Sequence, residues 1–124
     1  MIEPIIFTSY YAKLRTGVLV NPISISLYLP RGIQLPTYKP LVPSEKLLLR
    51  WKRGHDTEDY IQSYREQLSR LDPILVVNSL RDLCGGYECT LMCYERSDNF
   101  CHRHLVRQWL NEHGYVCHEV EFSK

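Results

Sequence analysis

The stretch "YECTLMCYE", residues 87–95, decides the fold of this sequence because it has the composition of a central β-strand. Apolar residues stand on both of its faces, which is typical of a strand that is covered on each side. "NFCHRHLVRQWLNEHG" at 99–114 has the spacing of an amphipathic helix, and "YVCHEVEF" at 115–122 has the residues of another strand. A strand, a helix and a strand in this order predict a crossover unit. The fold class is therefore α/β, with a mainly parallel sheet and flanking helices.

The rest of the chain predicts further elements of the same fold. "IIFTSY" at 5–10 and the alternating "ISISLYL" at 23–29 predict two more strands. Four prolines and one glycine in residues 30–43 predict a loop without regular structure. Three helices are predicted from their N-caps, which are Ser44 (helix through Arg53, closed by Gly54), Asp56 or Thr57, and Asp72 (followed by Pro73 and closed by glycines). For the third of these, the run "ILVV" at 74–77 leaves a strand as the alternative.

Two of the predicted helices carry an apolar face that we expect to point into the core. The expected core positions are Tyr60, Ile61, Tyr64, Leu68 and Leu71 in one helix, and Leu105, Val106, Trp109 and Leu110 in the other, with Gly114 as the stop of the latter. The chain has 124 residues, of which 44% are hydrophobic. That amount supports one core, so we expect a single domain over residues 1–124.

Composition narrows the classes of function. A formal net charge of +1 and a pI near 7.7 argue against strong bulk attraction to nucleic acid. The start "MIEPIIFTSYY" has no basic region of a signal peptide, and the aliphatic runs are too short to cross a bilayer. We therefore expect a cytoplasmic protein without a membrane partner. Its five cysteines should then be mostly free thiols.

The polar stretch "CYERSDNFCHRH" at 93–104 is the main candidate site. It lies where the central strand ends and the next helix begins, and ligands of open α/β sheets bind at that edge. If Asp98 is the cap, Cys101 lies in the first helical turn, where the dipole lowers the pKa of a thiol. Cys101 would then be a nucleophile, with Glu95 or His102 moving protons. The same turn, with Arg103, could instead hold a phosphate or carboxylate without chemistry.

Each of these residues also has a structural alternative. Cys101 could be a buried thiol, and His102 a hydrogen-bonded histidine on the core side of the helix. Glu95 could pair with Arg103, whose role would then be a salt bridge.

Other segments could complete a polar pocket at the same edge. Arg31 follows the second strand, Ser9 and Tyr10 end the first, and Cys93 leaves the central strand on the same face as Glu95. "LLLRWKRGH" at 47–55 could be a nucleic-acid patch, although a helix end with solvated cations explains it as well.

A metal site is not predicted. There is no C-x2-C pair, and the imaginable ligands are Cys93, Cys101, His102 and His118. If Cys101 and His102 are neighbours on a helix, their side chains point in divergent directions. A redox pair of Cys93 and Cys101 stays open, because sequence cannot show whether their Cα atoms come within the roughly 7 Å that a disulfide needs.

The string "LMCYERSDNFCHRHLV" resembles the domain of unknown function 488 family, whose pattern is C-Y-E-x5-C-H-R. "FTSYYAKL", "ISISLYLPRGI", "YKPLVPS" and "LDP" continue the resemblance in order along the chain. Ser97 and Arg96 depart from the proline and lysine of the family's turn. The resemblance implies a small cytosolic α/β protein of bacteria and their phages, and it implies no activity. Its motif residues are Cys93, Glu95, Cys101, His102 and Arg103, with Ser9, Tyr10, Arg31 and Gly32 as further matches.

Three hypotheses for the function follow. The first is a pocket at the carboxyl ends of the strands that binds a small anionic ligand, such as a nucleotide or a nucleic-acid phosphate, with no cofactor. The second is a thiol-dependent enzyme with Cys101 as its nucleophile. The third is an interaction protein, phage-encoded in one version, in which the C-H-R cluster at 101–103 only supports the fold.

Overall fold

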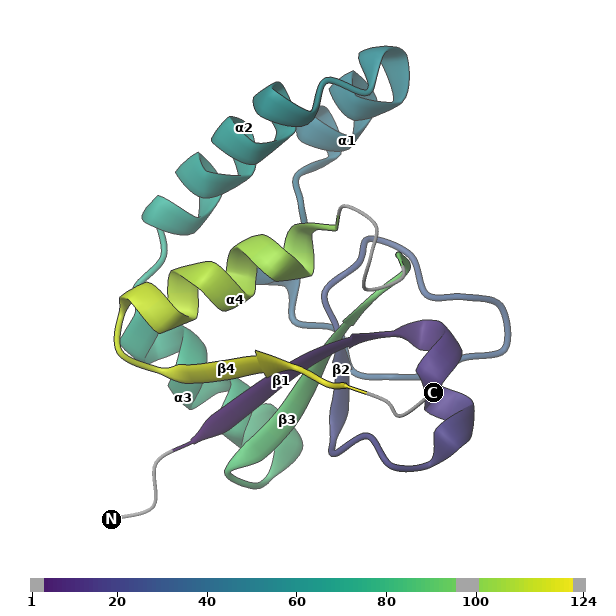
Figure 1. Ribbon diagram of the computed structural model, residues 1–124, viewed down its shortest axis with the longest axis vertical. Coiled ribbons are helices and arrows are strands. Elements are labelled where there is room, and N and C mark those ends of the chain that lie inside the picture. Colours follow the sequence, from purple (N-terminus) through teal and green to yellow (C-terminus); the bar gives the residue numbers. More distant parts are fainter. Residues whose placement is uncertain (1–3, 96–100, 122–124) are drawn as a thin grey trace.

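A four-stranded, entirely parallel sheet lies at the centre of the computed structural model, which describes residues 4–95 and 101–121 (Figure 1). The strands are β1 (Ile5–Tyr10), β2 (Pro22–Ser24), β3 (Glu88–Cys93) and β4 (Val116–Glu119), in the order β2-β3-β1-β4. The predicted central strand is therefore central, because β3 pairs with β1 on one side and β2 on the other. The predicted α/β fold with a parallel sheet is confirmed.

The helices begin where local capping predicts them. They are α1 (Glu45–Gly54), α2 (Thr57–Ser69), α3 (Pro73–Cys84) and α4 (His102–Glu112). The side chains of Ser44, Asp56 and Asp72 each accept a hydrogen bond from a backbone N–H of the first turn of α1, α2 and α3. The strand alternative for "ILVV" is therefore wrong. α1 includes Gly54, and it is His55 that takes the left-handed conformation, with φ 50°.

The second strand is shorter than predicted. β2 ends at Ser24 rather than at residue 29, and Leu27 and Tyr28 are exposed. Ile25 still donates its N–H to the carbonyl of Met92. Beyond it the chain turns away from the sheet, because its neighbour β3 ends at Cys93.

The predicted loop at 30–43 also contains a short 3-10 helix, η2 (Lys39–Leu41), and another, η1 (Tyr11–Thr16), follows β1.

α4, α2 and α1 form successive layers over the sheet, and α3 packs against β3. α4 packs against β1, β3 and β4, α2 packs against α4, and α1 packs against α2 (Figure 1). The expected core positions are confirmed, since Tyr60, Tyr64, Leu68, Leu105, Val106, Trp109 and Leu110 are buried and Ile61 and Leu71 pack against them half-buried. This arrangement brings the beginning of α4 and the last turn of α1 to the carboxyl end of the sheet.

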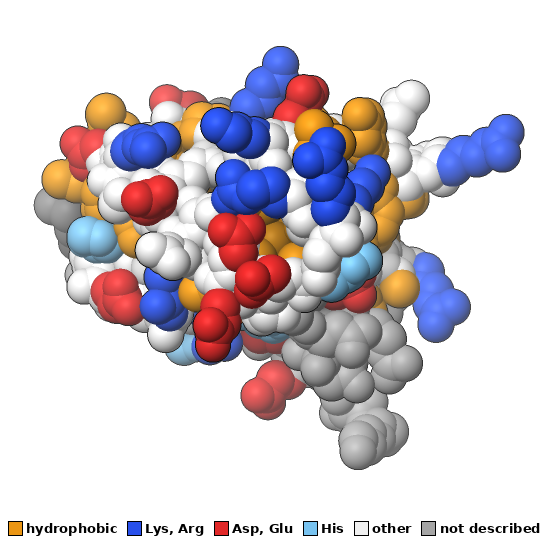
Figure 2. All heavy atoms as spheres, turned by 90° about the horizontal axis from the view of Figure 1, so that it is seen from above, with side chains coloured by type: hydrophobic (Ala, Val, Ile, Leu, Met, Phe, Trp, Pro, Cys, Tyr) orange, Lys and Arg blue, Asp and Glu red, His pale blue; other side chains and the backbone are white. Residues whose placement is uncertain are grey.

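The outer surface of α1 and α2 carries charges of both signs. Figure 2 shows Lys and Arg side chains interspersed with Asp and Glu side chains on this face, and Arg50 of α1 is paired with Asp59 of α2 at 3.1 Å. None of the helices in the described part of the chain has the length and apolar character needed to span a membrane.

Candidate functional site

A pocket of about 640 Å³ opens at the carboxyl end of β2 and β3. Its floor is formed by Cys93 at the end of β3, together with Cys101 and His102 at the start of α4. The last turn of α1 and the segment after β2 form the facing walls. The sequence placed a pocket at this edge of the sheet, and the structure has one there.

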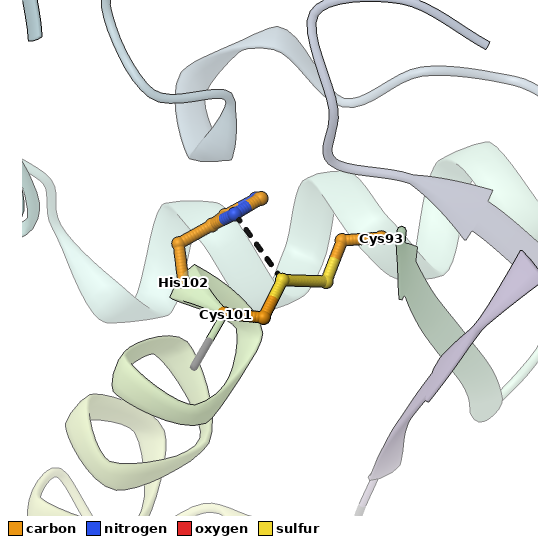
Figure 3. A group of neighbouring side chains, drawn as sticks. All are labelled: Cys93, Cys101 and His102. Carbon is orange, nitrogen blue, oxygen red and sulfur yellow. Dashed lines mark hydrogen bonds between the residues drawn. A yellow bond between two sulfur atoms is a disulfide. The ribbon is translucent and has the colours of Figure 1, made fainter. Parts of the chain in front are cut away.

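The two cysteines of the floor are joined. The sulfur atoms of Cys93 and Cys101 form a disulfide, and the Cα atoms lie 7.3 Å apart (Figure 3). Cys101 has extended backbone angles, φ −153° and ψ 148°, and it is the N-cap of α4 rather than a residue of its first turn. The sequence prediction was wrong on this point because it started the helix earlier. Its proposed cap, Asp98, lies outside the described residues.

His102 lies beside the disulfide and is buried. Its Nε2 is 2.6 Å from the carbonyl oxygen of Ile25. Its Nδ1 is 3.7 Å from Sγ of Cys101 (Figure 3). A carbonyl oxygen only accepts, so Nε2 holds the proton and Nδ1 presents a lone pair to the sulfur. Burial lowers the pKa of His102 to about 4, with the charge of Arg103 as a smaller cause in the same direction and the Ile25 hydrogen bond opposing it. The hydrogen bond expected for a buried His102 is therefore present.

Arg103 lies behind Cys93, fully buried, and does not line the pocket. Its Nε and Nη2 donate to the Glu119 carboxylate at 3.0 and 2.9 Å, and its Nη1 donates to Sγ of Cys93 at 3.0 Å and to the carbonyl oxygen of Glu95. The Thr8 hydroxyl donates to the same carboxylate. The salt-bridge alternative is therefore present in the structure, but its acid is Glu119 on β4 and not Glu95. A guanidinium held in this way is not presented to a ligand in the pocket.

Of the other predicted site residues, one lines the pocket and three do not. Glu95 is exposed and lines the pocket. The ring of Tyr10 lies next to the Arg103 guanidinium, with 5.5 Å between Cζ of Arg103 and the ring centroid. Ser9 is buried, and its hydroxyl has no hydrogen-bond partner within the described ranges. Arg31 is exposed in the loop after β2, and neither it nor the two β1 residues lines the pocket.

An aromatic wall of the pocket was not predicted from the sequence. Trp51 of α1 and His55, the residue that follows α1, have ring centroids 5.1 Å apart, and the centroid of the Trp51 ring lies 5.3 Å from that of Tyr60 of α2. Lys52 and Tyr94 also line the pocket. The spacing of Trp51 and His55 was the available signal. The sequence hypotheses treated this stretch as a nucleic-acid patch or as solvated cations, and the structure places part of it in the pocket.

The comparisons with known proteins identify a family and nothing closer. Residues 10–114 match the family model DUF488-N3a, described as the active DUF488-N3 subclade. This match covers most of the chain and supports the resemblance found in the sequence. No curated protein and no solved structure matches the chain.

Proposed function

The chain belongs to the domain of unknown function 488 family, in a subclade described as active, and we propose that it is a thiol-dependent enzyme that reacts through Cys101 and Cys93. The observation that carries this proposal is the position of two bonded sulfur atoms on the floor of a pocket at the carboxyl end of a parallel sheet. Nδ1 of His102 is placed to accept the proton of the Cys101 thiol, and the Arg103 guanidinium favours the thiolate form of Cys93.

Cys101 is the attacking thiol in this proposal. Its residue is 6% exposed against 1% for Cys93, and Nδ1 of His102 faces its sulfur with a lone pair. A nucleophile, a base and a group that orients the base are the parts of an activated nucleophile, and the Ile25 carbonyl orients the imidazole here. His102 rather than Glu95 is therefore the base that we assign.

Cys93 is the second thiol. The N–H of Arg103 at 3.0 Å stabilises negative charge on its sulfur, because a donor on a cationic group favours the thiolate. A stabilised thiolate is also the better leaving group when a disulfide is opened. Glu119 holds the guanidinium in place for this contact.

The reaction that these groups fit is thiol–disulfide exchange. The Cys101 sulfur attacks one sulfur of a substrate disulfide R–S–S–R′ while its proton passes to Nδ1 of His102, because an imidazole with a pKa of about 4 takes that proton only as the thiol reacts. A mixed disulfide Cys101–S–S–R forms, and R′S⁻ leaves with that proton. The Cys93 thiolate then attacks the Cys101 sulfur, RS⁻ leaves, and the Cys93–Cys101 disulfide of the structure remains. The substrate gains the two electrons that the protein loses, and an external thiol reductant restores the dithiol.

The aromatic walls of the pocket favour a substrate with a flat ring, and Lys52 favours a negative charge at its own side of a pocket whose other charged wall residue is Glu95. The rings of Trp51, Tyr60 and Tyr94 offer stacking surfaces, and Lys52 offers the positive charge that Arg103 and Arg31 do not supply there. This lining also supports the second candidate function, in which the pocket binds a nucleotide-like anion without any thiol chemistry.

Dithiobis(nitrobenzoate), an aromatic disulfide with carboxylates that releases a coloured thiolate, tests the first proposal. The assay uses reduced protein in a Cys84→Ser background, since Cys84 is the half-buried free thiol. We expect two coloured thiolates per chain and an intramolecular disulfide at the end. Cys93→Ser should stop after one thiolate with a mixed disulfide that mass spectrometry detects. Cys101→Ser should react at least about ten-fold more slowly.

Two results would count against this proposal. If Cys101→Ser reacts as fast as its parent, Cys101 is not the attacking thiol. If no intramolecular disulfide forms, the two thiols do not act together. The binding candidate is tested separately, by thermal shift of the Cys101→Ser variant with adenosine monophosphate. A stabilisation that Trp51→Ala abolishes supports binding without chemistry, and no stabilisation contradicts it.

A further inference from the structure

The geometry of the pocket floor points to a metal site, and we infer that the reduced chain binds one Zn²⁺ ion through Sγ of Cys93, Sγ of Cys101 and Nδ1 of His102. These three ligand atoms lie within 4.8 Å of one another, and all three residues are buried. Two thiolates and one imidazole form a set that Zn²⁺ prefers, because it is a borderline-soft ion with N and S ligands. The inference requires only that the disulfide be reducible.

The backbone explains how neighbouring residues can share one ion. Cys101 is extended and precedes α4, whereas His102 is the first residue of the helix, so their side chains converge instead of diverging. The distance from Sγ of Cys101 to Nδ1 of His102 is 3.7 Å. Tetrahedral Zn²⁺ with its usual Zn–S and Zn–N bond lengths places such a ligand pair about 3.6 Å apart. Sγ of Cys101 and Nδ1 of His102 therefore already have the spacing that a tetrahedral zinc ion requires.

The second edge, between the sulfurs, forms when the disulfide is reduced. Two thiolates on one tetrahedral Zn²⁺ lie about 3.8 Å apart, so the sulfurs must separate by rotation of their side chains. The Cα atoms of Cys93 and Cys101 are 7.3 Å apart, and this spacing leaves room for an ion between the sulfurs. The disulfide and the metal complex therefore exclude each other.

The surroundings of the ligands are those of a metal site. His102 donates from Nε2 to the Ile25 carbonyl, and metal-bound histidines commonly make this bond with the nitrogen that is not the ligand. Arg103 donates to the sulfur of Cys93, which stabilises a coordinating thiolate. These contacts fix Nδ1 as the free nitrogen and the Cys93 thiolate as a charged ligand.

The fourth coordination position would face the pocket. Cys93, Cys101 and His102 all line it, and no fourth protein ligand joins their cluster among the described residues. Zinc sites with three protein ligands and an open position bind water or a substrate atom there. An anionic ligand between Trp51 and Tyr94 could thus coordinate the ion directly, and the metal-bound form would accept thiolate or carboxylate ligands.

Co²⁺ is the spectroscopic probe that tests this site. Protein reduced with a phosphine, in the Cys84→Ser background and without oxygen, is titrated with Co²⁺. We expect one Co²⁺ per chain, with a thiolate-to-cobalt charge-transfer band, and displacement by Zn²⁺. The disulfide form, which has the same sequence and fold, should give no band. Cys93→Ser, Cys101→Ser and His102→Gln should each weaken binding at least about ten-fold.

The controls separate this inference from the proposed thiol exchange. Cys117→Ser, whose thiol is buried on β4, should keep the full band. Reduced protein without a charge-transfer band, or a band that survives in Cys93→Ser/Cys101→Ser, would overturn the metal site. The reaction with dithiobis(nitrobenzoate) is measured on metal-free protein, so it can succeed when the metal site fails. Excess Zn²⁺ should slow that reaction, and an unchanged rate would contradict binding by these thiols.

Discussion

Arg103 donates a hydrogen bond from Nη1 to the sulfur of Cys93 at 3.0 Å, while the same guanidinium is bound to the carboxylate of Glu119. One buried cation thus connects the end of the central strand β3 with the edge strand β4. The pair explains why β4 matters to the site although none of its residues lines the pocket. A substitution of Glu119 on β4 should therefore change the hydrogen bonding of the Cys93 sulfur.

Glu119→Gln tests this connection through stability. Arg103 is fully buried, and the Glu119 side chain is 16% exposed, so water replaces the lost carboxylate only in part. Breaking a buried ion pair by removing one partner is costly, and Gln retains one acceptor, so we expect a loss of about 2 kcal/mol in the free energy of unfolding. Urea denaturation of the disulfide form measures it. The control is Glu121→Gln, which alters an exposed carboxylate nearby and should change stability little.

The sequence predicted the fold where local interactions decide it. The caps Ser44, Asp56 and Asp72 act within their own first turns, so their residues alone reveal them. The length of β2 depends instead on where its neighbour β3 ends, and residues 25–29 contain no sign of that. The start of α4 was predicted too early, because the polar residues between β3 and α4 suit the end of a strand and the start of a helix equally well.

The candidate site was predicted where its residues are adjacent in the chain and missed where they are not. Cys93, Glu95, Cys101 and His102 come together because a short connection joins β3 to α4. Trp51 reaches them through the packing of α1 on α2, and the spacing of Trp51 and His55 marks a shared face without showing which part of the fold that face meets. The ion pair of Arg103 with Glu119 depends in the same way on where β4 joins the sheet.

Lys52→Glu tests the charge preference of the pocket. Lys52 lines the pocket, so reversing its charge should slow the reaction of reduced protein with the anionic dithiobis(nitrobenzoate) by about three- to ten-fold at low salt. The reaction with dithiodipyridine, a neutral aromatic disulfide, should change little. Lys46→Glu is the matched control, because Lys46 is exposed on α1 and does not line the pocket. An equal effect of both variants would show that only the net charge matters.

Tyr64→Phe tests a buried hydrogen bond next to His102, whose ring lies 5.4 Å from the Tyr64 ring between centroids. The Tyr64 hydroxyl donates to the carbonyl of Leu41, and both residues are fully buried. Removing the hydroxyl leaves that carbonyl without its donor, so we expect a loss of about 2 kcal/mol in the free energy of unfolding. Tyr94→Phe is the matched control, since its hydroxyl donates to the Tyr28 carbonyl at the exposed surface. Chemical denaturation compares the two, and equal losses would contradict the role of burial.

The buried thiols of Cys89 and Cys117 should resist alkylation in the native protein. Burial raises the pKa of each to about 12, from 9.0 for an ordinary thiol, because the apolar core disfavours the thiolate. At pH 9 the thiolate population should be roughly several hundred-fold smaller in the folded than in the unfolded chain. The folded state keeps protons that the unfolded state releases, so this contribution to stability is complete below pH 9 and declines as the pH rises toward 12.

Peptide mapping after iodoacetamide treatment at pH 9 measures the difference, with the half-buried Cys84 as the internal control. Cys84 should be modified first, and the two core thiols only after urea is added. Rapid modification of Cys89 or Cys117 in native protein would contradict their burial. It would also make thiol counts in the disulfide assay ambiguous. A Cys89→Ala variant should flatten the alkaline decline in stability, because it removes one of the two protons that folding retains.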